Sequence, residues 1–321
     1  MQGYRAPAWL PGGHAQTIWA AKVSRRGSVS PLEFVRERWS TPDHDFIDVD
    51  LRTTTQNARW LVVFHGLEGS SASHYIQAFA AAAHAGGLNF AAPHFRGCSG
   101  ELNLGPRAYH SGDFEEVGWI LQRLRERSEA ALIAAGVSLG GNALLRWAEE
   151  AGDSAARIAA SVAAVCSPLD LAAGGHAIGR GLNRQIYTRM FLASMKPRAL
   201  AKLAQHPGLF DRERLMSARD LYAFDNVFTA PLHGFENTDD YWSRASAKPH
   251  LHRICIPALV LNARNDPFVP ASSLPRQGDV GRHVTLWQPE HGGHVGFPAG
   301  MPPGDVTTMP QAVLQWLLAH A

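Results

Sequence analysis

One serine stands between glycines in the stretch GVSLG, residues 136–140, and this pentapeptide constrains the fold more than any other feature. The apolar run ALIAAG precedes it, and NALLRWAEEA follows with the apolar spacing of a helix. A strand that turns sharply into a helix strains the residue at the turn, so its neighbours have to be small. We therefore predict a nucleophile elbow with Ser138 at its tip. Gly136 and Gly140 are then required sterically, and Gly141 leaves room for the helix to pack on the strand.

Short apolar runs alternate with helical patterns along most of the chain. The runs expected to form strands buried on both faces are 60–66, 88–92, 131–136, 158–165, 256–262 and 283–287. Helical spacing appears between them, and Thr308 and Pro310 open a last helix. This alternation predicts a mostly parallel central sheet with helices on both faces. Residues 31–52 alternate around Pro42 and Asp43, which predicts an antiparallel hairpin at one edge.

Residues 170–250 interrupt this alternation. Their pattern is helical and irregular, and they carry the aromatic residues Tyr187, Phe191, Phe210, Tyr222, Phe224, Phe228, Phe235, Tyr241 and Trp242. Ligands of open α/β sheets bind at the carboxyl ends of the strands, so one interpretation is a helical cap or lid over a pocket there. Additional core packing explains the same composition. In either case, we predict that residues 1–321 form one domain that contains this insertion.

Two residues late in the chain are candidate partners of the serine. A serine hydroxyl needs a base to take its proton, and the base needs an acid that holds it in one tautomer. After a nucleophile elbow the partners follow in the order acid, histidine. Asp266 follows the run 256–262 in NARNDPFVP, and His294 follows the run 283–287 in EHGGHVGF. All three residues then lie at carboxyl ends of strands, so we expect them at one edge of the sheet.

Other residues compete for these two roles. Asp225, Asp239 and Asp240 are alternative acids, but none of them follows a strand of the predicted sheet. His291 is an alternative base only three residues before His294. We prefer His294 because the glycines before it free the backbone, while the apolar residues after it can return to the core.

Acyl transfer from an ester also requires N–H groups that stabilise the oxyanion. One should come from the residue after the nucleophile, Leu139, and a second from a loop after an early strand. HGLEG, residues 65–69, follows the run WLVVF, so the amide of Leu67 is the expected second donor. We expect His65 in the same loop to be a structural brace and not a second base.

Composition limits the remaining function classes. The formal charge is +2, and the basic residues are scattered, which argues against a nucleic-acid partner or a polybasic membrane patch. Cys98, Cys166 and Cys255 are widely spaced and form no CxxC pair, which disfavours a disulfide framework and suits a reducing compartment. His291 and His294 form an H-x-x-H pattern on a glycine-rich loop, unlike the helical pattern of zinc enzymes. We expect a cytoplasmic protein with no membrane span, no metal and no cofactor.

With these pieces in place, the chain resembles the YheT-like family of α/β-hydrolases. The resemblance spans most of the sequence and rests on the strings HAQTIWA, HGLEGSSASHYI, FRGCSGELN, YHSGD, GVSLGGNALLRW, FDNVFTAPLHGF, DDYWSRAS, NARNDPFVP and HGGHVGF. It implies the α/β-hydrolase fold, hydrolysis of carboxylic esters, and Ser138, Asp266 and His294 as the triad. The chain departs from the family pattern with HAQT in place of HLQT and NDP in place of DDP. Within FRGCSGE, we expect Arg96 and Glu101 to pair, and Cys98 has no obvious base.

These observations predict a serine esterase that acts on short- to medium-chain esters through an acyl-enzyme intermediate. An acyltransferase would use the same triad with an alcohol in place of water. A binding protein on a retired hydrolase fold is the third possibility. Retired hydrolases usually lose a triad residue, and all three are present in this chain.

Overall fold

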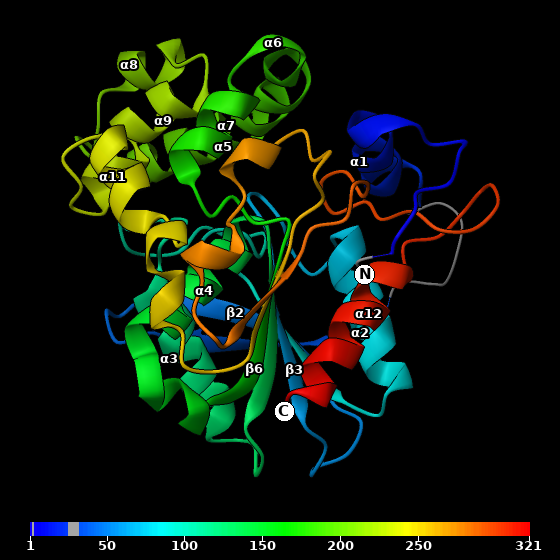
Figure 1. Cartoon of the computed structure of the whole chain (residues 1–321). Helices are drawn as coiled ribbons and strands as arrows, with labels where there is room; N and C mark the ends of the chain where they lie inside the picture. Colours follow the sequence, from blue (N-terminus) through cyan, green and yellow to red (C-terminus); the bar gives the residue numbers. More distant parts are fainter. Residues whose placement is uncertain (2, 25–31) are drawn as a thin grey trace.

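The buried apolar runs of the sequence form one central sheet. The computed structural model describes residues 1, 3–24 and 32–321. Within these residues, eight strands pair in the order β1-β2-β4-β3-β5-β6-β7-β8 (Figure 1). The strands are β1 (Val35–Ser40), β2 (Phe46–Arg52), β3 (Trp60–Phe64), β4 (Asn89–Pro93), β5 (Leu132–Val137), β6 (Ala159–Val165), β7 (Ala258–Leu261) and β8 (Val284–Trp287). Strands β3 to β8 are parallel, whereas β2 is antiparallel to β1 and β4, so the predicted mostly parallel sheet is confirmed.

The antiparallel hairpin at the edge of the sheet is also confirmed. Strands β1 and β2 pair with Ser40 opposite Phe46, where the chain reverses direction. Pro42 and Asp43 lie in the turn between the two strands. The predicted hairpin begins at residue 31, which lies outside the described residues.

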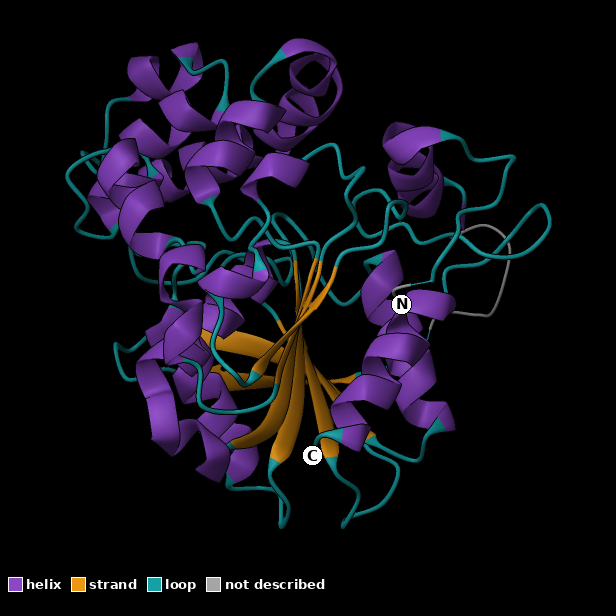
Figure 2. Ribbon diagram, viewed as in Figure 1, coloured by secondary structure: helices purple, strands orange, loops and turns teal. Residues whose placement is uncertain are grey.

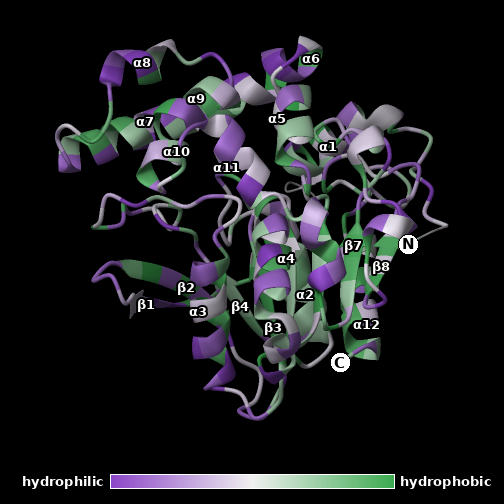
Figure 3. Ribbon diagram, turned by 60° about the vertical axis from the view of Figure 1, so that its left-hand side comes forward, coloured by the Kyte–Doolittle hydropathy of each residue, from purple (hydrophilic) through white to green (hydrophobic). Residues whose placement is uncertain are grey.

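Helices cover both faces of the sheet (Figure 2). They are α2 (His74–Ala85) and α12 (Thr308–Ala319) on one face, and α3 (Phe114–Arg125) and α4 (Leu139–Ala151) on the other. Successive side chains of a strand point to opposite faces. In β3, Leu61 and Val63 pack with α2 and α12, while Val62 and Phe64 pack with α3 and α4. Two buried faces therefore explain why the strands are continuously apolar, and Figure 3 shows them as a hydrophobic centre.

The segment between β6 and β7 forms a separate helical layer at the carboxyl ends of the strands, at the top of Figure 1. Its helices are α5 (Leu171–Ile178), α6 (Gly181–Asn183), α7 (Arg189–Gln205), α8 (Arg212–Ser217), α9 (Leu221–Val227), α10 (Thr229–Leu232) and α11 (Thr238–Ala245). Several of its aromatic residues, such as Phe224 and Phe228, bury one another in a small core of their own. The position matches the predicted cap. Its role as a lid, and the assignment of the whole chain to one domain, stay predictions.

One helix that the sequence pattern did not predict lies near the start of the chain, as α1 (Gly12–Lys22). Pro11 precedes it, and Gly12 has a left-handed φ of 75°, so the local sequence resembles a loop. Gln16 and Thr17 are nonetheless buried against the rest of the protein. Tertiary contacts therefore stabilise this helix more than its own propensity does. Within the described part of the chain, no helix combines the length and apolar character that crossing a bilayer requires.

Candidate active site

The serine lies at the strained turn between β5 and α4. Ser138 has φ 54° and ψ −120°, a conformation that costs free energy for any residue with a side chain. A Cβ atom on Gly136 would lie 2.4 Å from the carbonyl oxygen of Gly140, and one on Gly140 would lie 2.4 Å from that of His65. A Cβ atom on Gly141 would lie 2.6 Å from the carbonyl oxygen of Gly136. The chain therefore needs all three glycines, as the pentapeptide predicted.

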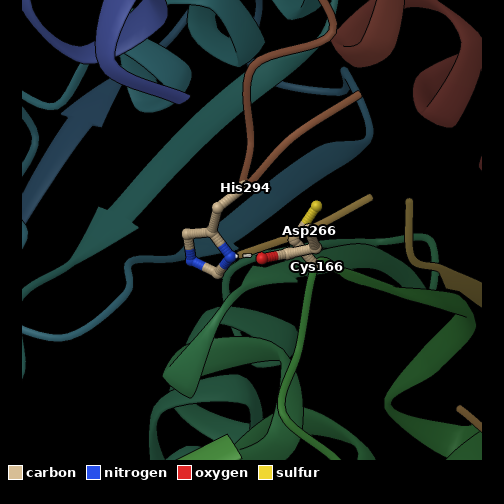
Figure 4. A group of neighbouring side chains, drawn as sticks. All are labelled: Cys166, Asp266 and His294. Atoms are coloured by element: carbon tan, nitrogen blue, oxygen red, sulfur yellow. Dashed lines mark hydrogen bonds and ion pairs between the residues drawn. The ribbon is translucent and has the colours of Figure 1, made fainter. Parts of the chain in front are cut away.

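Three polar side chains from separate strand ends form a continuous hydrogen-bonded chain. The Ser138 hydroxyl lies 3.1 Å from Nε2 of His294, and Nδ1 of His294 lies 2.8 Å from Oδ2 of Asp266. Oδ1 of Asp266 accepts hydrogen bonds from the backbone N–H groups of Phe268 and Val269. A carboxylate can only accept, so Nδ1 carries the proton and Nε2 is free to accept one from the serine. Figure 4 shows the imidazole beside the Asp266 carboxylate.

The alternative acids and the alternative base lie elsewhere. Asp225 is in α9 and accepts hydrogen bonds within the helical insertion. Asp239 and Asp240 are in α11, where they bond to neighbours in the insertion. His291 is exposed at the surface. The geometry thus brings together the three residues expected from their positions after strands, and His294 is the histidine that meets the serine.

Helix α1 supplies two residues that hold the histidine loop, and sequence reasoning did not assign them a role. Oε1 of Gln16 accepts from the Asn265 side chain at 3.0 Å and from the backbone N–H of Gly292 at 2.9 Å. The Thr17 hydroxyl accepts from the backbone N–H of His294 at 2.8 Å. The string HAQTIWA, one of those that carry the family resemblance, was the available signal, but its partners lie more than 240 residues away.

Two backbone N–H groups beside the serine are available as donors. Leu139 is the first residue of α4, so its N–H has no acceptor within the helix. Neither its N–H nor that of Leu67 hydrogen-bonds to another described residue. Both residues line one cavity together with Ser138 and His294. This is the arrangement expected of an oxyanion hole.

His65 braces the loop that carries Leu67. Its Nε2 accepts from the N–H of Phe95 at 3.1 Å, and its Nδ1 lies 2.8 Å from the carbonyl oxygen of Gly66. Burial lowers the pKa of His65 from 6.5 to about 3, so the ring is neutral. The expectation of a structural brace is therefore confirmed.

A residue of the insertion also holds this loop. Nη1 of Arg198, on α7, donates to Oε1 of Glu68 at 2.9 Å. The backbone N–H of Glu68 donates to the Tyr109 hydroxyl at 3.0 Å, which in turn lies 3.0 Å from Oε1. Glu68 itself has a left-handed φ of 57°. The residue after Leu67 is thus fixed by the side chains of two other segments.

The predicted pairing of Arg96 with Glu101 is wrong. Glu101 pairs with Arg38 at 3.0 Å, at the surface of the hairpin. The buried Arg96 guanidinium instead contacts Asp45 at 3.0 Å and Glu116 on α3. A buried cation requires hydrogen-bonded anions around it, and Asp43, Asp45 and Glu116 provide them. Arg96 therefore joins the hairpin to a helix on the face of the sheet.

The three free cysteines offer no alternative nucleophile in this cavity. Burial raises the pKa of the Cys98 thiol to about 11. Cys166 is also fully buried, and burial together with the nearby Asp266 carboxylate raises its pKa well above the usual value. A thiol is a nucleophile or metal ligand only as the thiolate. Cys255 lies outside the residues that line the cavity.

One group of side chains in the described residues has the spacing of a metal site. Potential ligand atoms of Cys166, Asp266 and His294 lie within 4.8 Å of one another (Figure 4). However, the Cys166 thiol is held in its protonated form, and Nδ1 of His294 already bonds to Asp266. The donor set therefore does not fit a metal ion, and we interpret the group as an acid–base pair beside a buried thiol.

The cavity at the serine is largely apolar. Leu171, Ile178, Phe191, Met195, Phe224 and Phe228 of the insertion line it, opposite Ser138 and His294. The insertion therefore supplies about half of the residues that line the cavity.

Comparison with known proteins identifies the family. A family model described as alpha/beta hydrolase fold matches residues 59–300. The chain belongs to the α/β-hydrolase family. It is 37% identical to YheT of Escherichia coli (strain K12), over 89% of this chain and 84% of that protein. The predicted YheT-like membership is thus confirmed.

Two more distant similarities extend over most of the chain. This α/β-hydrolase is 26% identical to human phospholipase ABHD3, over 98% of this chain and 78% of that protein. The solved structure of the Pyrococcus furiosus esterase Pf2001 superposes with a TM-score of 0.54 at 16% identity, covering 91% of this chain and 94% of that one. The structural similarity to Pf2001 confirms the α/β-hydrolase fold.

Proposed function

We propose that this α/β-hydrolase is a serine esterase that cleaves carboxylic esters through an acyl-enzyme intermediate. The observation that carries the proposal is the hydrogen-bonded chain from Ser138 through His294 to Asp266, which opens into an apolar cavity. A strained elbow holds the serine at the end of this chain. These are the parts that nucleophilic catalysis by a serine requires.

Each part has a defined step in the reaction. His294 takes the proton of Ser138 through Nε2, and the serine oxygen attacks the ester carbonyl. The N–H groups of Leu67 and Leu139 stabilise the oxyanion. The alcohol leaves with the proton from His294, and a water molecule activated by the same nitrogen then releases the acid. Asp266 stabilises the imidazolium that forms in both halves of the reaction.

The apolar walls of the cavity support esters with short- to medium-length acyl chains as substrates. Burial of each methylene contributes about 0.8 kcal/mol to binding. The names of relatives support ester hydrolysis in general, since ABHD3 is named a phospholipase and Pf2001 an esterase.

The proposal is tested by hydrolysis of p-nitrophenyl hexanoate. We expect the native protein to hydrolyse this ester and Ser138→Ala to lose at least about 10⁴-fold in kcat. Ser154→Ala, an exposed serine just after the C-terminal end of α4, is the matched control and should leave the rate unchanged. Equal rates for Ser138→Ala and the native protein would contradict the proposal.

A further inference from the structure

A carboxyl group of the insertion faces the same cavity as the serine. Asp225, on α9, lines this cavity together with Ser138 and His294. Surrounding protein atoms raise the pKa of Asp225, and burial is the largest cause of that shift. The residue is nevertheless only partly buried, so some of its surface is accessible. Because it also lines the cavity, we infer that its accessible surface faces that space. It is thus an acidic side chain set into walls that are otherwise mostly apolar.

The contacts of Asp225 leave part of its hydrogen-bonding capacity unused. The Thr229 hydroxyl donates to Oδ1 at 2.6 Å, and Nε1 of Trp242 donates to Oδ2 at 2.9 Å. Both donors are neutral, and no cationic side chain of the described residues acts on this carboxyl. A carboxylate accepts about four hydrogen bonds. Burial raises the pKa of Asp225 to about 6, so the ionised form dominates above that pH and can accept further bonds.

A hydrogen-bond donor lines the same cavity. Nδ1 of His110 accepts from the N–H of Gly112 at 3.2 Å, so its proton is on Nε2. Burial and the neighbouring His233 lower the pKa of His110 well below its usual value, which keeps the ring neutral. Its Nε2 forms no hydrogen bond with another described residue. His110 packs on Tyr241, the residue before Trp242.

This further inference rests on the proposed esterase function and names its substrate class. We propose that Asp225 is a specificity-determining residue that binds a hydroxyl group of the ester, at a position other than the reacting carbonyl. A hydroxyl can donate a hydrogen bond to Asp225, and His110 provides a donor elsewhere on the wall of the same cavity. An alkyl group in its place would leave the remaining acceptor positions of the buried carboxylate unfilled, which disfavours unsubstituted esters.

The experiment compares matched esters that differ by one hydroxyl. Propyl hexanoate against 2-hydroxypropyl hexanoate tests the alcohol side, and methyl hexanoate against methyl 6-hydroxyhexanoate tests the acyl side. We expect kcat/KM to be about tenfold or more higher for the hydroxylated ester of one pair, mainly through a lower KM. Hexanoylcholine tests whether a cation is preferred instead.

Two variants separate recognition from structure. Asp225→Asn keeps the size of the side chain: its amide oxygen can accept from Nε1 of Trp242, and its amide nitrogen can donate to the Thr229 hydroxyl. It removes the charge that strengthens the bond to substrate. We expect it to reduce the preference to about twofold or less while the rate of fluorophosphonate labelling at Ser138 stays unchanged. Asp239→Asn is the matched control: this exposed carboxylate on α11 accepts from the Tyr222 hydroxyl and does not line the cavity.

Three outcomes would overturn the inference. The native protein could show no preference in either pair, or it could prefer hexanoylcholine over every hydroxylated ester. Asp225→Asn could also lower kcat/KM equally for both members of a pair. Calorimetric binding of the same pairs to Ser138→Ala reads the preference without catalysis. Hydroxyl-dependent binding without hydrolysis by the native protein would contradict the esterase proposal and leave the binding subsite supported. Hydrolysis without hydroxyl-dependent binding would support the esterase proposal and contradict the binding subsite.

Discussion

The two oxygens of Asp266 have separate tasks. Oδ1 accepts the backbone N–H groups of Phe268 and Val269 and so fixes the acid loop. Oδ2 accepts from the imidazole of His294, 2.8 Å away. The carboxylate side chain is completely buried, so this bond is not weakened by water. Oδ2 therefore orients the ring of the histidine, while Oδ1 fixes the loop of the acid.

Asp266→Asn should separate these tasks. The amide oxygen can still accept from the two backbone groups, but the amide nitrogen would face Nδ1 of His294 and force the proton onto Nε2. That tautomer cannot take the proton of Ser138, so we expect kcat for p-nitrophenyl hexanoate to fall about 10³- to 10⁴-fold. A circular dichroism melt checks that the fold persists. A variant that keeps more than a tenth of the native kcat would show that Asp266 does not orient the base.

At the scale of elements, the site is held by helices from outside the sheet. Helix α1 contacts the acid and histidine loops through Gln16 and Thr17. Helix α7 contacts the loop of Leu67 through Arg198 and Glu68. The strands place the three polar side chains at one edge, and these two helices fix the loops that carry them.

Thr17→Val tests the contribution of α1. The valine cannot accept the backbone N–H of His294, so the histidine loop loses its fixed position. We expect kcat to fall about tenfold or more with little change in KM, because misplacement of a base affects the chemical step. Thr17→Ser restores the hydroxyl and should recover most of the rate. Equal rates for the valine and serine variants would assign Thr17 a packing role only.

Arg198→Met tests the contribution of α7. It removes the 2.9 Å contact with Glu68 and leaves the neighbouring amide of Leu67 less well fixed. We expect a loss in kcat of up to about 10²-fold, the effect of weakening one oxyanion donor. Arg189→Met, an exposed arginine on the same helix, provides the comparison. If both variants lose activity equally, the loss comes from removing a positive charge on α7 and not from a change in the loop of Leu67.

At the scale of the whole molecule, the sequence predicted the parts that depend on local pattern. Strands buried on both faces must be apolar throughout, so their runs were visible, and parallel strands bring their carboxyl ends to one edge. Helix α1 was missed because Pro11 and Gly12 at its start are typical of a loop. Its stability also comes from contacts with residues far away in the sequence. The partners of Arg96 were missed because Asp45 is 51 residues away in the chain. The cytoplasmic location stays a prediction.

The buried, neutral His65 should make the stability of the protein depend on pH. Its pKa is about 3 in the folded protein and 6.5 in a model peptide, so only the unfolded state takes up a proton between these values. Stability should therefore fall as the pH decreases from 6.5 towards 3, by about 1.4 kcal/mol per pH unit from this residue. His65→Asn keeps a donor and an acceptor but has no such proton. Urea unfolding from pH 6.5 to 4.5 should show a shallower decline for the variant, and parallel curves would exclude this role.

Identification of the residue that carries the acyl group tests the central claim most directly. After reaction with a fluorophosphonate probe, peptide mapping by mass spectrometry should place the adduct on Ser138, and His294→Ala should abolish the reaction. An adduct on another residue, or hydrolysis of p-nitrophenyl hexanoate that continues after Ser138 is blocked, would contradict the account.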